Sequence, residues 1–201
     1  MLLKSCFALA VLVLGVGVVV PVGGEGPRTA DRAAAWNLDA SHSSVLFRIK
    51  HLDVSNFWGR FDKVEGSMVW DEADLTKCSV TIEIDAASVD TNNAERDTHV
   101  KGPDFFDTAH FPKMTFKSSS VKKKEGADSY ELAGDLTFHG VTKAMTLEIR
   151  KVGSAETRMG TRCGFDCRFT LDRSDFGVKT YPATILGHEI EVLVALECVK
   201  G

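Results

Sequence analysis

The chain has 201 residues, of which 44% are hydrophobic and 26% are charged, and these proportions are typical of one globular domain with a sizeable core. Its formal net charge of −4 argues against the basic face that nucleic-acid binding requires, so we expect no nucleic acid among its partners. The lysine run at 122–124 precedes Glu125 and Gly126 and is typical of a solvated turn.

The first 24 residues have the pattern of a secretory signal peptide. Lys4 supplies a positive start, residues 5–24 carry no charge, and small residues end the segment at Gly24. These are the three parts of such a signal, so we predict cleavage after Gly24 and a protein that is periplasmic or secreted. Cleavage after Ala35 is the second candidate. An uncleaved N-terminal membrane anchor is the alternative, because the uncharged run is long enough to cross a bilayer.

Residues 25–35 (EGPRTADRAAA) are polar and small, with a Gly-Pro break, and are predicted to form a flexible linker. From Trp36 onward the dominant period is two, which indicates strands with one buried face. The predicted strands, with the first short one counted as part of the second, lie near 36–39, 44–52, 59–70, 77–86, 111–120, 129–138, 143–151, 160–171 and 187–199.

Long, amphipathic and mostly sequential strands favour an antiparallel barrel, because closure of the sheet leaves no exposed strand edge. The pair His139-Gly140 lies between two of these strands and predicts a tight hairpin there. The expected fold is therefore all-β, an eight-stranded antiparallel barrel.

One stretch breaks the period of two. Asn92 is predicted to cap a helix over 94–101, and a second short turn then carries Phe105 and Phe106. The barrel should therefore contain a short helical insertion near 92–107. The two phenylalanines either plug ordinary core or border the mouth of a cavity, and the sequence favours neither.

An eight-stranded barrel has an interior that either fills with side chains or encloses one small ligand. The inward positions predicted here carry apolar side chains and almost no ionisable residue, which favours an apolar ligand or none. The candidate lumen residues are Phe47, Ile49, Ile82, Ile84, Phe105, Phe106, Phe116, Leu136, Phe138, Leu147, Phe165, Phe169, Phe176, Val192 and Val194.

Four cysteines follow the predicted signal peptide: Cys78, Cys163, Cys167 and Cys198. Cys163 and Cys167 lie four residues apart on one predicted strand, about 13 Å at ~3.3 Å per residue, which is too far for a bond between them. A bridge to Cys78 or Cys198 and a role as small apolar side chains both remain open.

The sequence contains no motif of a serine hydrolase, zinc protease, phosphate-binding loop, dinucleotide-binding loop or dithiol redox site. No two of its six histidines have the local spacing of metal ligands. We therefore predict no catalytic residue, no bound metal and no cofactor. The alternative is a hydrolase or metal enzyme with a polar site at the barrel mouth, built from His42, His51, His99 and Asp97.

The segment 87–100 (ASVDTNNAERDTHV) closely resembles the signature segment of the YceI-like, polyisoprenoid-binding family. Shorter motifs that resemble the family occur in the same order across residues 36–199. They are 39–43 (DASHS), 50–52 (KHL), 59–61 (GRF), 104–107 (DFFD), 111–112 (FP), 134–137 (GDLT), 140–142 (GVT) and 173–177 (RSDFG).

This resemblance implies that residues 36–199 form an extended lipocalin-like barrel holding a long isoprenoid or similar amphiphilic lipid. It implies a protein that carries or sequesters this lipid in the periplasm or outside the cell, with no catalytic residue to carry over. Asn93 departs from a histidine in some relatives, and four cysteines are more than the family leads us to expect. A transient membrane contact, a homodimer, and a plain filled barrel acting as an interaction protein remain open.

Overall fold

The computed structural model describes residues 34–126 and 128–201. Within these ranges eleven strands form one antiparallel sheet. They are β1 (Ala34–Leu38), β2 (Ser44–His51), β3 (Ser55–Phe61), β4 (Val64–Trp70), β5 (Ser79–Asp85), β6 (Val89–Asp90), β7 (Lys113–Lys123), β8 (Ser129–Phe138), β9 (Val141–Thr157), β10 (Gly160–Asp172) and β11 (Leu186–Lys200). The predicted signal peptide and most of the predicted linker lie outside the described residues.

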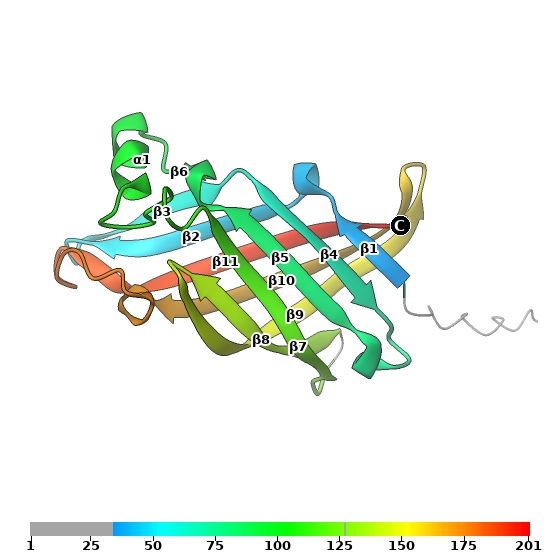
Figure 1. The fold of residues 1–201 in the computed structure, drawn as a ribbon. Coiled ribbons are helices and arrows are strands. Elements are labelled where there is room, and N and C mark those ends of the chain that lie inside the picture. Colours follow the sequence, from blue (N-terminus) through cyan, green and yellow to red (C-terminus); the bar gives the residue numbers. More distant parts are fainter. Residues whose placement is uncertain (1–33, 127) are drawn as a thin grey trace, which may run out of the picture.

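The sheet closes into a barrel because β1 pairs with both β4 and β11 (Figure 1). The closed ring runs β1-β4-β5-β7-β8-β9-β10-β11 and returns to β1. Strand β2 also pairs with β11, β3 pairs with β2, and β6 pairs with β3, so these strands lengthen the wall. Strands β1 and β2 both pair with β11, so they count together as one strand of the wall. In the same way β3 and β4 count as one strand, and β5 and β6 count as one strand. The predicted eight-stranded antiparallel barrel is confirmed.

The two ends of the barrel differ (Figure 1). One end carries the helix α1 (Ala94–Lys101), the β2–β3 turn and the loop that precedes β11, and we name it the α1 end. The opposite end carries the β9–β10 turn. Short 3-10 helices interrupt the strands at η1 (Ala40–His42), η2 (Leu75–Lys77), η3 (Ala86–Ser88) and η4 (Arg173–Phe176). Within the two described ranges no helix has both the length and the apolar character needed to cross a bilayer.

The linker prediction was wrong at its last two residues. Ala34 and Ala35 already belong to β1, where they pair with Trp70 and Val69 of β4. Ala34 is 6% exposed and packs in the main apolar cluster, so a small side chain there contributes to the core. Strand pairing also satisfies backbone hydrogen-bonding groups that burial would otherwise leave without partners.

The helix prediction was correct in extent and wrong in its cap. Asn93, and not Asn92, caps α1, because its side-chain oxygen accepts from the backbone N–H of Arg96 at 2.9 Å. Asn92 has φ of 59°, a left-handed conformation that asparagine tolerates, whereas a cap residue needs extended backbone. The hairpin at His139-Gly140 is confirmed, with φ of 48° and 71° at the two turn residues.

The opposite end of the barrel interior is filled by aromatic side chains. The ring of Trp70 packs edge-on against the rings of Tyr130 and Phe165, with distances between ring centres of 4.9 Å and 4.8 Å. Trp36 is buried in the same cluster. Such pairs add roughly 0.5–1.5 kcal/mol each beyond the burial of their area. The interior is therefore closed by side chains at this end, and its free space lies toward the α1 end.

The cysteines of the described residues form no disulfide. Cys163 on β10 lies directly opposite Cys198 on β11, and a hydrogen bond between the two thiols lowers the pKa of Cys198. Burial raises the pKa of Cys78, and it raises the pKa of Cys167 to about 12. The bridge to Cys78 or Cys198 that the sequence left open is absent from this structure, and Cys78, Cys163 and Cys198 are buried.

Candidate functional site

Two apolar cavities lie end to end inside the barrel. The inner cavity has a volume of about 120 Å³, and the outer cavity, nearer the α1 end, has a volume of about 470 Å³. The outer volume lies within the roughly 300–1,000 Å³ typical of small-molecule sites. The residues that line both cavities are Val45, Ile84, Met114, Leu136, Phe169 and Val192. We call the two cavities together the lumen.

Fourteen of the fifteen candidate lumen residues line one cavity or both. Those of the inner cavity alone are Ile82, Phe116, Leu147, Phe165 and Val194. Those of the outer cavity alone are Phe47, Ile49, Phe105, Phe106 and Phe138. Ile84, Leu136, Phe169 and Val192 line both. Phe105 and Phe106 therefore border a cavity, which is one of the two roles that the sequence left open.

Phe176 is the exception. It lines neither cavity and is 2% exposed, packed against Phe138 at 5.4 Å between ring centres and against Val178. Phe176 belongs to η4, so the alternation of inward and outward side chains that holds in a strand does not apply to it. The prediction that Phe176 lines the lumen was therefore wrong. Its side chain instead packs η4 against the barrel wall at Phe138.

The sequence interpretation missed several lumen residues. Met114 lies two residues before Phe116 on β7 and therefore faces the same side, so the period of two was a sufficient signal for it. Tyr181 and Ile185 also line the outer cavity, but they come from the loop between η4 and β11. That loop has no periodic pattern, so no signal in its own sequence places it over the lumen.

One glycine shapes the outer cavity. Gly59 on β3 pairs directly with Phe47 on β2, and a Cβ at Gly59 would lie 2.3 Å from the Phe47 ring. The ring therefore lies across the neighbouring strand in space that any side chain at residue 59 would occupy. Glycine at residue 59 therefore leaves the space that the Phe47 ring occupies beside the outer cavity.

The polar side chains of the outer cavity include no carboxylate. They are His51, Thr91, Arg96, His99, Arg173 and Tyr181. Arg96 lies over the ring of Phe57 at 4.3 Å and donates to the side-chain oxygen of Thr91 at 3.0 Å and to its carbonyl at 2.7 Å. Asp97 in turn accepts from the backbone N–H and hydroxyl of Thr91. These bonds explain the polar residues of the signature segment 87–100 as a lock that holds α1 on the barrel.

Arg173 is buried without a carboxylate in contact with its guanidinium. It is 1% exposed, and burial lowers its pKa. All of its hydrogen bonds described in the structure go to backbone carbonyls, at 2.8–3.0 Å. The acceptors are Val178, Thr180, Tyr181, Leu186 and Gly187. The loop over the outer cavity is therefore wrapped around one cation.

The four residues of the alternative enzyme site are not brought together. His51 and His99 line the outer cavity, and Asp97 is engaged by Thr91. His42 lies elsewhere, in η1, where its Nδ1 is 3.0 Å from the Oδ2 atom of Asp39. The prediction that these four residues form one polar site is therefore wrong.

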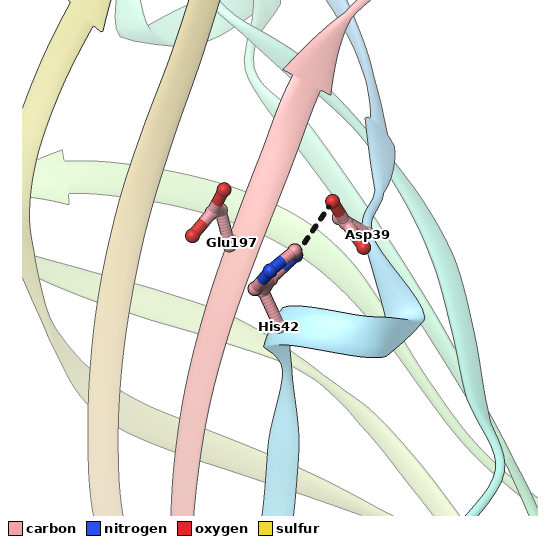
Figure 2. A group of neighbouring side chains, drawn as sticks. All are labelled: Asp39, His42 and Glu197. Carbon is pink, nitrogen blue, oxygen red and sulfur yellow. Dashed lines mark hydrogen bonds and ion pairs between the residues drawn. The ribbon is translucent and has the colours of Figure 1, made fainter. Parts of the chain in front are cut away.

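His42 belongs to a different group, with Asp39 and Glu197 (Figure 2). One potential ligand atom from each lies within 4.8 Å of the others. However, Nη1 of Arg162 donates to Oδ2 of Asp39 at 2.6 Å and also donates to Glu197. The hydrogen bond from Arg162 holds the pKa of Asp39 well below its usual range. The arginine already compensates both carboxylates. The group joins η1 to β10 and β11.

Comparison with known proteins agrees with this architecture. Residues 36–198 match the family described as YceI-like domain. Protein YceI of Escherichia coli O157:H7 is 38% identical over 173 residues, covering 84% of this chain and 88% of that protein.

Two solved structures also resemble this one. Burkholderia cenocepacia BcnA superposes with a TM-score of 0.73 at 26% identity, covering 80% of this chain and 98% of that chain. A polyisoprenoid binding domain from Saccharophagus degradans gives a TM-score of 0.63 at 16% identity, covering 85% and 100%, and shares the fold. The family match spans nearly all the described residues, and with the E. coli relative it shows that this chain belongs to the YceI-like family.

Proposed function

We propose that this protein binds and carries, or sequesters, a long-chain isoprenoid-type amphiphilic lipid in its lumen. The observation that carries the proposal is the lumen itself, which is lined along its length by apolar side chains and has its larger cavity near one end. The family, and a neighbour of the same fold that is a polyisoprenoid binding domain, support this class of ligand.

Burial of the lipid tail alone supplies enough free energy. A buried methylene contributes about 0.8 kcal/mol, so three five-carbon units contribute up to about 12 kcal/mol before the cost of ordering the chain. Micromolar affinity needs about 8 kcal/mol. The head group therefore needs to supply only orientation, and we expect loose head-group specificity.

A binding role fits the polar residues better than catalysis does. The outer cavity has two histidines and two arginines but no carboxylate to pair with a histidine as an acid–base couple. We therefore propose a binding protein without a catalytic residue, a metal or a cofactor, whose bound lipid is its ligand.

The first experiment is organic extraction of the purified protein followed by mass spectrometry. We expect a long-chain lipid at about one molecule per barrel. Recovery of no lipid from freshly purified protein would contradict the proposal and favour a barrel that acts as an interaction protein. Stoichiometric zinc in elemental analysis would instead favour the metal-enzyme alternative.

We further propose that residues 1–24 direct export and are removed. Cleavage after Gly24 leaves β1 whole, whereas cleavage after Ala35 would remove two residues that pair with β4. The intact mass of exported protein should therefore correspond to a chain that begins at Glu25. A species that retains residues 1–24 in the membrane fraction would show an anchored protein instead.

A further inference from the structure

Exposed apolar side chains gather at the α1 end, beside the outer cavity. Half of the large apolar residues that are exposed in the described part of the chain lie here, on the β2–β3 turn and on the loop before β11. They are Leu52 (50% exposed), Val54 (82%), Tyr181 (42%) and Ile185 (40%), and we call them the rim. Single exposed apolar residues are ordinary, but a cluster of them marks a contact surface.

Two residues of the rim have unfavourable backbone conformations. Leu52 has φ of 52° and Tyr181 has φ of 65°, in the left-handed region that bulky side chains rarely adopt. The two segments are joined because the backbone N–H of Leu52 donates to the carbonyl of Ile185 at 2.9 Å. Neither side chain is buried, so core packing does not account for these apolar residues at strained positions. Strain of this kind concentrates at functional surfaces.

The second rim segment is fixed by the buried cation. Arg173 donates to the carbonyl of Tyr181 at 3.0 Å and to that of Leu186 at 2.8 Å, on either side of Ile185. The exposure of Tyr181 and Ile185 is therefore built into the loop and does not result from an unpacked chain.

The rim is continuous with the lumen. Tyr181 and Ile185 are exposed at the rim and also line the outer cavity, so one apolar surface runs from the outside of the protein to the ligand space. A protein partner seated here would cover this mouth. A lipid bilayer would instead continue this apolar surface into the membrane, where a water-insoluble ligand is dissolved.

The charge of the rim segments also suits a bilayer. Residues 50–54 and 177–187 contain Lys50, Lys179 and one acidic residue, Asp53, in a protein of net charge −4. The Lys50 ammonium lies 3.8 Å from the Asp53 carboxylate, so the turn itself is nearly neutral. Tyr181 has an apolar ring with a polar tip, the type of side chain that concentrates at membrane–water interfaces.

We propose that the rim of Leu52, Val54, Tyr181 and Ile185 docks on a lipid bilayer, and that the lipid ligand passes between bilayer and lumen there without crossing water. This inference rests on the proposed function for its ligand, whereas the docking itself requires no bound lipid.

The test is flotation with vesicles of phosphatidylcholine and phosphatidylglycerol, using the double variant Leu52→Asn, Val54→Ser. Neither residue lines the lumen, and asparagine tolerates the left-handed backbone of residue 52. The matched control is Val152→Ser, Met159→Ser, which removes two exposed apolar side chains on β9 and its turn (Figure 1). We expect the rim variant to bind vesicles about tenfold more weakly, the control to bind like the parent, and both to retain preloaded lipid and thermal stability.

Several outcomes overturn the inference. They are equal vesicle binding by the rim variant and the parent, no vesicle binding by the parent, equal weakening in the control, and a parent dimer that the rim variant converts to monomer. The last would make the rim a contact between two copies. Repeating flotation with delipidated protein separates this inference from the proposed function. Vesicle binding without any extractable ligand would keep the rim and reject the lipid carrier, and the reverse result would reject only the rim.

Discussion

Replacing Arg173 by leucine should destabilise the protein by at least about 3–5 kcal/mol, because five backbone carbonyls would lose the guanidinium as a hydrogen-bond donor. Arg173→Lys should fall between this variant and the parent, since an ammonium has three donors where the guanidinium has five. The free energy of unfolding from urea titration measures both effects.

The control is Arg150→Leu. Arg150 is an exposed arginine whose guanidinium contacts Asp166 at 2.9 Å, so its loss should cost less than about 1 kcal/mol. If Arg173→Leu unfolded at the same urea concentration as Arg150→Leu, the loop before β11 would not depend on the buried cation.

Ile82→Glu should abolish retention of the lipid. Ile82 lines the inner cavity, and a carboxylate there would be stranded among apolar side chains at a cost of several kcal/mol unless it became protonated or drew in water. Thr81→Glu is the matched control. Thr81 is the exposed neighbour of Ile82 on β5, and its side chain points away from the lumen. Mass spectrometry of organic extracts from folded proteins, with their stability measured in parallel, separates lost binding from lost folding.

Phe165→Ala should leave a folded barrel with a larger inner cavity and a changed range of retained chain lengths. His99→Ala should keep its lipid, because His99 is exposed at the edge of the outer cavity, with its ring against Phe105. If the histidine variant lost its lipid while the phenylalanine variant retained an unchanged profile, a polar site and not the apolar lumen would hold the ligand.

Strand alternation predicted most of the lumen because it is a local property. Ile82 and Ile84 face inward for the same reason that Thr81 faces outward, and pairing with neighbouring strands does not alter that order. The failures lie where distant contacts decide. The conformation at Tyr181 depends on a guanidinium eight residues away, and nothing in the pattern of residues 177–185 reports it. The cap of α1 moved by one residue because Asn92 and Asn93 are the same residue type, and backbone conformation alone distinguishes them.

The candidate polar site failed for a related reason. A sequence shows which residues have suitable chemistry, but the barrel placed His42 beside Asp39 in η1 and placed His51 and His99 at the outer cavity. The relation between these positions depends on how the strands wind around the barrel. By contrast, the barrel itself followed from the length and alternation of the strands, and the order of motifs across residues 36–199 agreed with it because it resembled a family whose fold already contains that winding.

The pairing of β1 with β11 has a consequence for the order of folding events. Trp36 pairs with Lys200 and Leu38 pairs with Cys198, so the seam that closes the barrel joins the start of the domain to its end. Contacts between residues so far apart in the chain form slowly, because the entropy of closing the longest loop is lost before any gain. Strand β11 also supplies partners to β10 and β2. Until β11 is in place, the apolar inner face of the other strands is therefore left open at this seam, and such exposed apolar surface favours aggregation during folding.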